Sequence, residues 1–415
     1  MSELLWFSPK PPARTDIANY SARVVPALAN HLALDWLDPA EPQGQAAHDP
    51  RFRNRAGLSC HNIGNNPQFH GAILQIAQVH PGVVILHDRC LQDLCFAVPS
   101  DHGQGGNPYR AAMVRWYDRA GAAAADAALS GAVTPAELGT DFPLFEEAVA
   151  GALAVVTHNP AVADEIAERF PGLPVLALPL PFPVRSRAGP AYMPPAADEP
   201  IRLVAFGFLN RNRRLVQIIE AWARSPARGR FRLDLAGELH NAGEVAAALE
   251  QSGLDPQVTI HGFLPEPELD RLIAGAHLVF NLRNPSMGEA SGSQLRIWAN
   301  GVPSAVTATG WYATLPPDAA LPISADDEAG DLAALFAGLA AGTIDLNRLA
   351  ERSRQALQAH DPGAYAARLA AWITKGQGDF MAAWAERALI EAAARGHAAA
   401  LPARIIPRLP ARLIR

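Results

Sequence analysis

The chain has 415 residues, of which 49% are hydrophobic and 18% are charged, and its formal net charge is −6. This length is too great for one ordinary core and predicts two α/β domains, while the apolar content excludes wholesale disorder. The negative net charge argues against nucleic-acid binding by bulk electrostatics, so no nucleic-acid partner is expected.

The first half of the chain reads as strands that alternate with helices. Short apolar runs predict strands at residues 4–7, 82–86 and 153–157, and helical patterns follow at 17–32 and 161–170. The proline-rich stretch at 173–200 suits neither helices nor strand interiors, so we interpret it as the last strand of the first domain followed by a linker.

The second half shows a regular alternation of strand and helix patterns, which is typical of a parallel sheet covered by helices on both faces. Strands are expected at 202–206, 231–236, 258–260, 278–282 and 304–307. Helices are expected at 214–225, 241–252, 266–275, 290–300 and 329–341.

These patterns predict two Rossmann-like, doubly wound parallel-sheet domains. We place an N-terminal domain at 1–185, a linker at 186–200, a second domain at 201–372, a crossover helix at 373–397 and a basic tail at 398–415. The Ala-rich C-terminal helix is expected to cross back and pack on the first domain.

Cysteine usage and hydropathy favour a cytoplasmic protein. Cys60, Cys90 and Cys95 are odd in number and lack Cys-x-x-Cys spacing, which argues against a disulfide framework or a zinc site. The N-terminal sequence lacks a signal-peptide pattern, and no apolar run reaches the ~18 residues that a transmembrane helix needs.

Polar side chains cluster where the predicted strands end. In open parallel sheets, ligands bind at the carboxyl ends of the strands, where loops lead into helix N-termini. Polar segments fall at residues 14–16, 87–88, 158, 210–214 and 283–293. Two such domains whose edges face each other would form one cleft, in which a charged diphosphate would need cations and helix dipoles.

Residues 282–301, LRNPSMGEASGSQLRIWANG, form the strongest candidate segment. Its small residues let backbone N–H groups approach a phosphate closely; they are Gly288, Ser291, Gly292 and Ser293. Glu289 is expected at the helix start, where a carboxylate can accept hydrogen bonds from sugar hydroxyls. Ser286 and Glu289 also have the Ser-x-x-Glu spacing of a capping box, and that alternative stays open.

Residues 206–222, FGFLNRNRRLVQIIEAW, form the second candidate segment. A strand is expected to end at Gly207, and Arg211, Arg213 and Arg214 precede an apolar-periodic helix. Arginine forks suit the oxygens of a diphosphate, and a fixed cation stabilises the charge that grows on a departing diphosphate. A solvated basic turn is the alternative, and it weighs most for Arg211 and Arg214.

Taken together, these segments resemble the retaining, GT-B-fold glycosyltransferases of family 4. The matching segments occur in the family's order: PPARTDIANYS (11–21), NIGNNPQFH (62–70), VVILHD (83–88), AVVTHNPAVADEI (154–166) and RNPSMGEASG (283–292). Arg213 matches the position of the family's diphosphate-binding lysine. The resemblance spans roughly residues 4–375.

The resemblance implies two domains facing a cleft and transfer of a sugar from a nucleotide-sugar donor to a saccharide or lipid-linked acceptor. It implies retention of anomeric configuration and a place in cell-surface polysaccharide or lipopolysaccharide synthesis. The implied catalytic residues are His87 and Glu289, which contact the donor sugar, and Arg213, which holds the diphosphate. Further donor-binding residues would be Thr15, Asp16, Gly207, Arg211, Arg214, Gly288, Ser291, Gly292, Ser293 and Arg296, with Asn65, Asp88 and His158 on the acceptor side.

The chain departs from the family pattern at three positions. Asp16 stands where glycine is common, arginine replaces lysine at 213, and Ile297 replaces the second acid of the family's Glu-x7-Glu motif. In the family that second acid grips the ribose. Its loss keeps an alternative open, namely a divergent or non-catalytic GT-B protein such as an epimerase, a phosphorylase or a partner subunit.

No cofactor and no metal ion are expected, with the nucleotide sugar acting as substrate. The acidic run at 326–328 reads as a solvated turn, and His61, His70 and His102 lack ligand spacing. The basic tail carries Arg404, Arg408, Arg412 and Arg415 among apolar residues. That pattern suits peripheral contact with an anionic membrane at its inner face, and a solvated tail is the equal alternative.

Overall fold

The computed structural model describes residues 3–13, 15–41, 57–98, 106–184, 192–197 and 199–394. Arg14, His102 and the basic tail at 398–415 lie outside the described residues, and so do the predictions made for them. The chain divides into two compact units. Unit 1 comprises Met1–Pro181, Met287–Ala290 and Pro362–Arg415, and unit 2 comprises Phe182–Ser286 and Ser291–Asp361.

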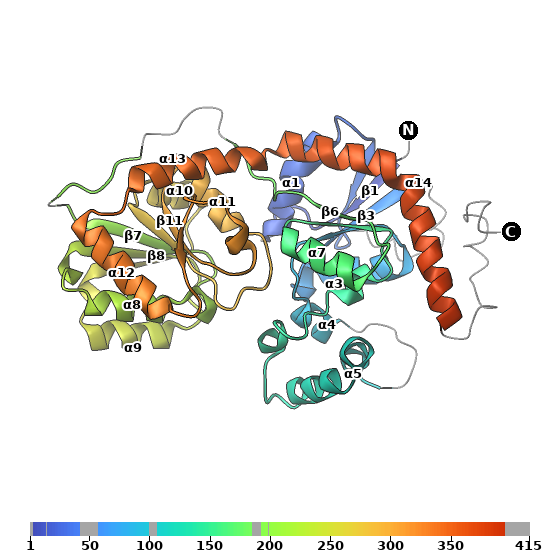
Figure 1. Ribbon diagram of the computed structural model, residues 1–415, viewed down its shortest axis with the longest axis horizontal. Coiled ribbons are helices and arrows are strands. Elements are labelled where there is room, and N and C mark those ends of the chain that lie inside the picture. Colours follow the sequence, from blue (N-terminus) through green and yellow to red (C-terminus); the bar gives the residue numbers. More distant parts are fainter. Residues whose placement is uncertain are drawn as a thin grey trace. The chain divides into compact units, whose positions relative to one another are not determined.

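Unit 1 is built on a parallel sheet in the order β2-β1-β3-β4-β5-β6. Figure 1 labels β1, β3 and β6 of this sheet. The strands are β1 (Glu3–Phe7), β2 (Leu34–Leu37), β3 (Gly57–Ile63), β4 (Val83–Leu86), β5 (Ala154–Thr157) and β6 (Val175–Ala177). The connecting helices are α1 (Asp16–Leu28), α3 (Pro67–Val79), α4 (Gln92–Ala97), α5 (Pro108–Leu129), α6 (Glu146–Val149) and α7 (Pro160–Arg169).

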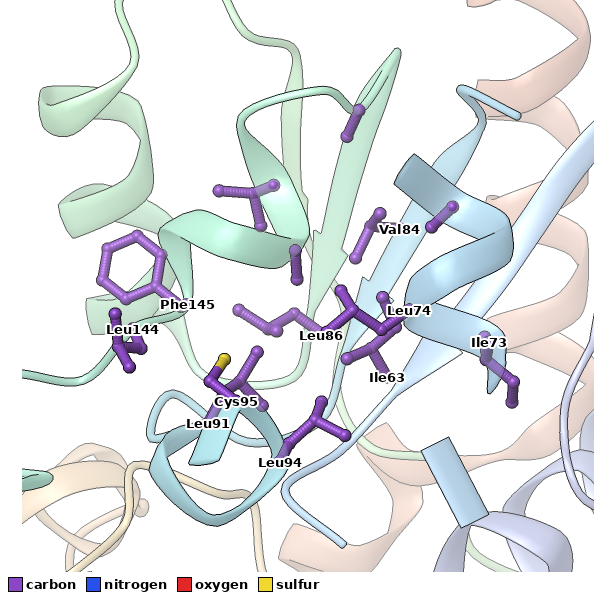
Figure 2. Close-up of a cluster of buried hydrophobic side chains, with 14 of the residues drawn as sticks. Ile63, Ile73, Leu74, Val84, Leu86, Leu91, Leu94, Cys95, Leu144 and Phe145 are labelled. Atoms are coloured by element: carbon purple, nitrogen blue, oxygen red, sulfur yellow. The ribbon is translucent and has the colours of Figure 1, made fainter. Parts of the chain in front are cut away.

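The two faces of this sheet are buried by different helices, because alternate side chains of a strand point to opposite faces. On β1, Leu5 and Phe7 join a core with α3, α4, α6 and α7, whereas Leu4 and Trp6 pack with α1 and the C-terminal helix. The first of these cores is drawn in Figure 2, where side chains of β3 and β4 meet those of α3 and α4. A strand buried on both faces must be apolar at nearly every position, as β4 is.

Unit 2 contains the second parallel sheet, in the order β12-β11-β10-β7-β8-β9. Its strands are β7 (Ile201–Phe206), β8 (Phe231–Ala236), β9 (Val258–Gly262), β10 (Leu278–Asn281), β11 (Ser304–Thr307) and β12 (Leu321–Ile323). The helices are α8 (Leu215–Arg224), α9 (Ala242–Ser252), α10 (Glu266–Ala274), α11 (Gly292–Ala299), α12 (Glu328–Ala341) and α13 (Leu346–Leu357). Within unit 2 the strand order steps outward from β7 in both directions, which makes the sheet doubly wound.

The C-terminal helix α14 (Pro362–Ala394) belongs to unit 1. It packs on α1, and the hydroxyls of Tyr20 and Tyr365 are hydrogen-bonded at 2.7 Å. The predicted return of the chain to the first domain is therefore confirmed. The helix begins at Pro362, ahead of the crossover segment placed at 373–397, because proline is favoured in the first turn of a helix and cannot continue the preceding 3₁₀ turn at Gln358–His360.

Within the described residues, no single helix is both long and apolar enough to cross a membrane. By length and composition alone, one bent pair of helical segments, Glu328–Ala341 with Leu346–Ile390, passes the same test.

His61 of β3 is a buried histidine whose ring stacks on Phe7, with ring centroids 5.2 Å apart. Its Nε2 is 2.9 Å from the carbonyl oxygen of His80, an acceptor. Burial lowers the pKa of His61 from 6.5 to about 3, and this outweighs the hydrogen bond to His80, which raises the pKa. Neutral His61 is therefore part of the folded state.

We predict that His61 contributes to acid destabilisation of unit 1. Below pH 6.5 the unfolded chain takes up a proton at His61 while the folded chain does not, so the free energy of unfolding falls as the pH drops from 6.5 towards 3. Between about pH 7.5 and about pH 5.5, the free energy of unfolding of His61→Gln should fall by on the order of 1 kcal/mol less than that of the wild type. Urea denaturation at the two pH values measures this difference. Glutamine can keep the hydrogen bond to His80.

The matched control is His31→Gln, at an exposed position in the same unit. This variant should keep the wild-type pH dependence. If His61→Gln and the wild type lost equal stability over this pH range, the assignment to His61 would be wrong.

Candidate functional site

Three neighbouring strands of unit 2 end at glycines with positive φ. Gly207 follows β7 with φ 98°, Gly237 follows β8 with φ 137°, and Gly262 ends β9 with φ 66°. A Cβ atom at Gly237 would lie 1.9 Å from the carbonyl oxygen of Gly207, so these turns pack backbone against backbone. The carboxyl edge of this sheet is therefore lined by bare main chain, which a ligand can approach closely.

Arg213 lies at this edge, in the short 3₁₀ turn Arg211–Arg213 that follows β7. The residue is 5% exposed. Nη1 donates to Asn281 Oδ1 at 2.6 Å, and Nε donates to the carbonyl oxygen of Phe208 at 3.3 Å. A Cβ at Gly207 would lie 3.2 Å from Nη2, so glycine leaves the room that the guanidinium occupies.

Asn281, the last residue of β10, connects Arg213 to the N-terminus of α11. Its Nδ2 donates to Gln294 Oε1 at 2.9 Å and to Ser291 Oγ at 3.3 Å. Ser291 is the N-cap of α11, and its Oγ accepts from the Gln294 backbone N–H at 3.1 Å. Gln294 Nε2 in turn donates to Ser304 Oγ at 2.7 Å. This buried network fixes a cation beside the positive end of a helix, which is the arrangement that binds anions.

Ser293 also lies near this edge, with Oγ 4.0 Å from the Cβ position of Gly207. The structure thus brings together four of the predicted donor-binding residues, which are Gly207, Arg213, Ser291 and Ser293. It adds Asn281 and Gln294, which sequence reasoning missed. The signal for Asn281 was an amide closing an otherwise apolar strand, LVFN, where a polar side chain needs a partner.

The other predicted arginines are directed elsewhere. Arg211 is 80% exposed in its side chain and pairs with Glu244. Arg214 pairs with Glu328 at 2.7 Å, and Arg296 pairs with Glu266 at 2.9 Å. Each acid neutralises its arginine locally, so these three cations contribute less to an anion site than Arg213 does.

The segment before α11 differs from the helix start that was predicted. The helix begins at Gly292 with Ser291 as its cap, so a capping box of Ser286 and Glu289 at this helix is wrong. Glu289 lies in the loop, where Oε2 accepts from the Met287 backbone N–H at 3.0 Å. Gly288 has φ 79°, a conformation that favours glycine, and with Glu289 it belongs to unit 1.

In unit 1, two strand ends carry histidines. His87 follows β4 and His158 follows β5, and their ring centroids are 5.1 Å apart. Tyr20 of α1 packs edge-on against His87 at 4.7 Å, and Tyr365 of α14 lies 5.7 Å from His158. His87 Nε2 is 3.1 Å from Oδ1 of Asn62, the penultimate residue of β3.

His87 is held in its neutral form. Burial lowers its pKa well below the usual 6.5, and the nearby His158 and His70 lower it further. A neutral imidazole presents one N–H donor and one lone pair, so this side chain can bind a hydroxyl without a charge.

The remaining predicted residues of unit 1 serve local structure. Thr15 caps α1 by accepting from the Ile17 N–H at 3.4 Å, and Asp16 is exposed in the first turn of that helix. Asn65 Oδ1 accepts from the backbone N–H of Asp93 at 3.0 Å, and the Asn65 N–H donates to Asp88 Oδ2 at 2.7 Å. Asn65 thus fixes the start of α4, beside the strand end that carries His87.

Among the described residues, no group of three or more His, Cys, Asp or Glu side chains is arranged to hold a metal ion. The three cysteines are buried free thiols.

No family model and no curated protein sequence matches the chain. Solved structures do match its fold. Sucrose-phosphate synthase from Thermosynechococcus elongatus superposes with a TM-score of 0.60 at 15% identity, covering 90% of this chain and 99% of that one. HepE from Anabaena, in complex with UDP, gives 0.57 at 14% identity, covering 90% and 100%. The lipopolysaccharide outer core galactosyltransferase WaaB gives 0.54 at 11% identity, covering 90% and 99%.

These likenesses confirm the predicted GT-B fold class. At such low identity they establish the fold alone, and the chemistry must be argued from this chain's own residues.

We predict that Gly207→Ala is destabilising for two separable reasons. At φ 98° any non-glycine residue is strained, which costs roughly 1–2 kcal/mol, and the new Cβ would press on Arg213 Nη2. In an Arg213→Ala background the second cost disappears, so Gly207→Ala should then lower the free energy of unfolding by less. Denaturant unfolding of the four proteins in this double-mutant cycle gives the coupling.

Gly253→Ala provides the control in the same unit. Gly253 has φ 64° and nothing lies within 4 Å of its Cβ position, so its cost should be the same with or without Arg213. Additive behaviour of Gly207→Ala and Arg213→Ala would contradict the contact.

Proposed function

We propose that this protein is a glycosyltransferase that moves a sugar from a nucleotide-sugar donor to a saccharide or lipid-linked saccharide acceptor. The transfer retains anomeric configuration, needs no metal or other cofactor, and takes place in cell-surface polysaccharide synthesis in the cytoplasm. The retention, the acceptor class and the pathway rest on the resemblance of the sequence segments.

The observation that carries this proposal is the buried Arg213 beside the N-terminus of α11. When a nucleotide sugar reacts, the bond to the diphosphate breaks and negative charge grows on the leaving oxygen. A cation held by Asn281 needs no reorganisation at that moment, so it stabilises the transition state more than the ground state. The α11 backbone N–H groups can bind the distal phosphate in the same way.

The solved neighbours support the same donor class. HepE has been solved with UDP and with UDP-glucose, and WaaB is a lipopolysaccharide outer core galactosyltransferase. We therefore propose a nucleoside diphosphate sugar as the substrate and a surface saccharide as the acceptor.

Two further side chains have proposed roles at the sugar. His87, neutral and partly exposed, would contact the donor sugar, and Glu289 would accept hydrogen bonds from its hydroxyls. Arg211, Arg214 and Arg296 have secondary roles at most in this proposal, because each pairs with an acid.

One observation favours a second candidate function, a divergent or non-catalytic GT-B protein. Ile297, at the position of the family's second acid, is fully buried in the core of unit 2 with Val204, Val279 and Val302. The position cannot supply a carboxylate to a ribose. Donor binding must then rely on other contacts, or it has been lost.

We predict that the protein binds and slowly hydrolyses at least one donor among UDP-, GDP-, ADP- and dTDP-glucose. Thermal shift would detect binding and released nucleotide would report turnover. Arg213→Gln should lower kcat on the order of 10²-fold, because a donor aimed at the developing charge is lost. Arg232→Gln, an exposed arginine of β8 in the same unit, serves as the control and should keep wild-type turnover.

The outcomes separate the candidates. Equal turnover by Arg213→Gln and the wild type would refute the site assignment. Release of a free epimerised sugar would indicate an epimerase, and a requirement for orthophosphate would indicate a phosphorylase. Folded protein that responds to no donor would favour the non-catalytic function.

A further inference from the structure

Asn62 is a fully buried residue of β3, and its side chain contacts β1 and the residue that follows β4. Its Nδ2 donates to the carbonyl oxygen of Phe7 on β1 at 3.0 Å. A carbonyl oxygen can only accept, so this bond fixes which end of the amide is nitrogen. Oδ1 must then face the other way, where it lies 3.1 Å from His87 Nε2.

This orientation determines where the proton of His87 sits. Oδ1 can only accept, so a hydrogen bond to it requires a hydrogen on Nε2. Because burial and two neighbouring histidines keep the pKa of His87 well below 6.5, the ring is neutral and carries a single hydrogen. Nδ1 therefore holds the lone pair.

Nδ1 is the atom of His87 that a ligand can reach. The residue is partly exposed, and within the described chain Nδ1 makes no hydrogen bond and is not among the buried polar atoms without a partner. Nε2 is directed to Asn62 in the interior of the unit. The hydroxyl of Tyr20, which packs against the ring, is hydrogen-bonded to Tyr365.

The neighbouring histidines do not compete for the side-chain oxygen of Asn62. His70 Nδ1 lies 3.1 Å from the Asn62 carbonyl oxygen, and His158 Nδ1 lies 3.1 Å from the Leu178 carbonyl oxygen. Each of these two rings has a backbone acceptor, which substitution cannot remove. His87 is the one of the three whose acceptor is a side chain.

We propose that Asn62 is a positioning residue that fixes His87 as the Nε2–H tautomer, so that Nδ1 accepts a hydrogen bond from a hydroxyl of the donor sugar. The tautomer follows from unit 1 alone, and its use at the sugar rests on the proposed glycosyl transfer. With Nδ1 protonated instead, the exposed nitrogen would donate, and the hydroxyl would have to reverse its own hydrogen bond. No bond to carbon forms or breaks at His87.

The tautomer is tested in the ligand-free native protein by two-bond ¹H–¹⁵N correlation NMR of labelled histidines. The His87 signals are assigned by their loss in His87→Asn. We expect a pyrrole-like Nε2 and a pyridine-like Nδ1 for His87 at neutral pH. A pyridine-like Nε2, or averaged signals from both tautomers, would overturn the proposal whatever the protein's activity.

Variants test whether Asn62 sets the tautomer of His87. In Asn62→Leu the acceptor is gone, so His87 should move to mixed tautomers, whereas Asn62→Asp keeps an acceptor opposite Nε2 and should keep the Nε2–H form. Ser59→Ala, on the same strand, should leave the His87 spectrum unchanged. An unchanged His87 spectrum in Asn62→Leu would overturn the positioning role of Asn62. If that variant does not fold, the spectra of the native protein and of Asn62→Asp still test whether His87 carries its hydrogen on Nε2.

Kinetics separate this inference from the proposed function. With the donor that the wild type turns over, Asn62→Leu should lower kcat/KM on the order of tenfold, and Ser59→Ala should not. A tautomer shift without loss of kcat/KM would overturn the role of Nδ1 at the sugar while glycosyl transfer stands. A wild-type protein that turns over no donor would end both the proposed function and that role, and the tautomer would still be decided by NMR.

Discussion

The hydrogen bond from Arg213 to Asn281 is the interaction on which the functional account of this protein depends. Removing a guanidinium from water is costly, and a buried arginine is stable when its fork is held by well-placed acceptors. Asn281 supplies one acceptor oxygen and uses its amide nitrogen to hold Gln294 and Ser291. One asparagine thereby ties the end of β10, the turn after β7 and the N-terminus of α11 into a single hydrogen-bond network.

Unit 1 uses an asparagine in a comparable way. Asn62 uses its nitrogen for a backbone carbonyl and its oxygen for His87, so an amide again sets the chemistry of a neighbouring functional group. In both units the side-chain amide is buried at a strand end, and its hydrogen-bond partners fix which end of it is nitrogen and which is oxygen. Both asparagines lie at strand ends because all strands of a parallel sheet end at the same edge. The apolar residues earlier in each strand fill the core, and the polar residues at its end lie at that edge.

Much of the fold was predictable because it follows from periodicity. β8 and β11 begin and end at the predicted residues, and the neighbouring helices deviate by one or two residues. β3 was missed because Ser59, His61 and Asn62 interrupt its apolar pattern. The buried His61 and Asn62 are tolerated because His80 after α3, Phe7 of β1 and His87 after β4 form hydrogen bonds with them. The site was predictable to the level of segments. Among the three arginines, the family resemblance already singled out Arg213. The sequence did not show what holds Arg211 and Arg214, because their partner acids, Glu244 and Glu328, lie far along the chain.

The diphosphate site that we propose around Arg213 in unit 2 can be measured by calorimetric titration of the protein with UDP and with uridine. The two ligands share a base and a ribose, so their difference isolates the phosphates. We expect UDP to bind at least about tenfold more tightly than uridine, because its phosphates form one or more charge-assisted hydrogen bonds. Equal affinities, or an unchanged UDP affinity in Arg213→Gln, would contradict it.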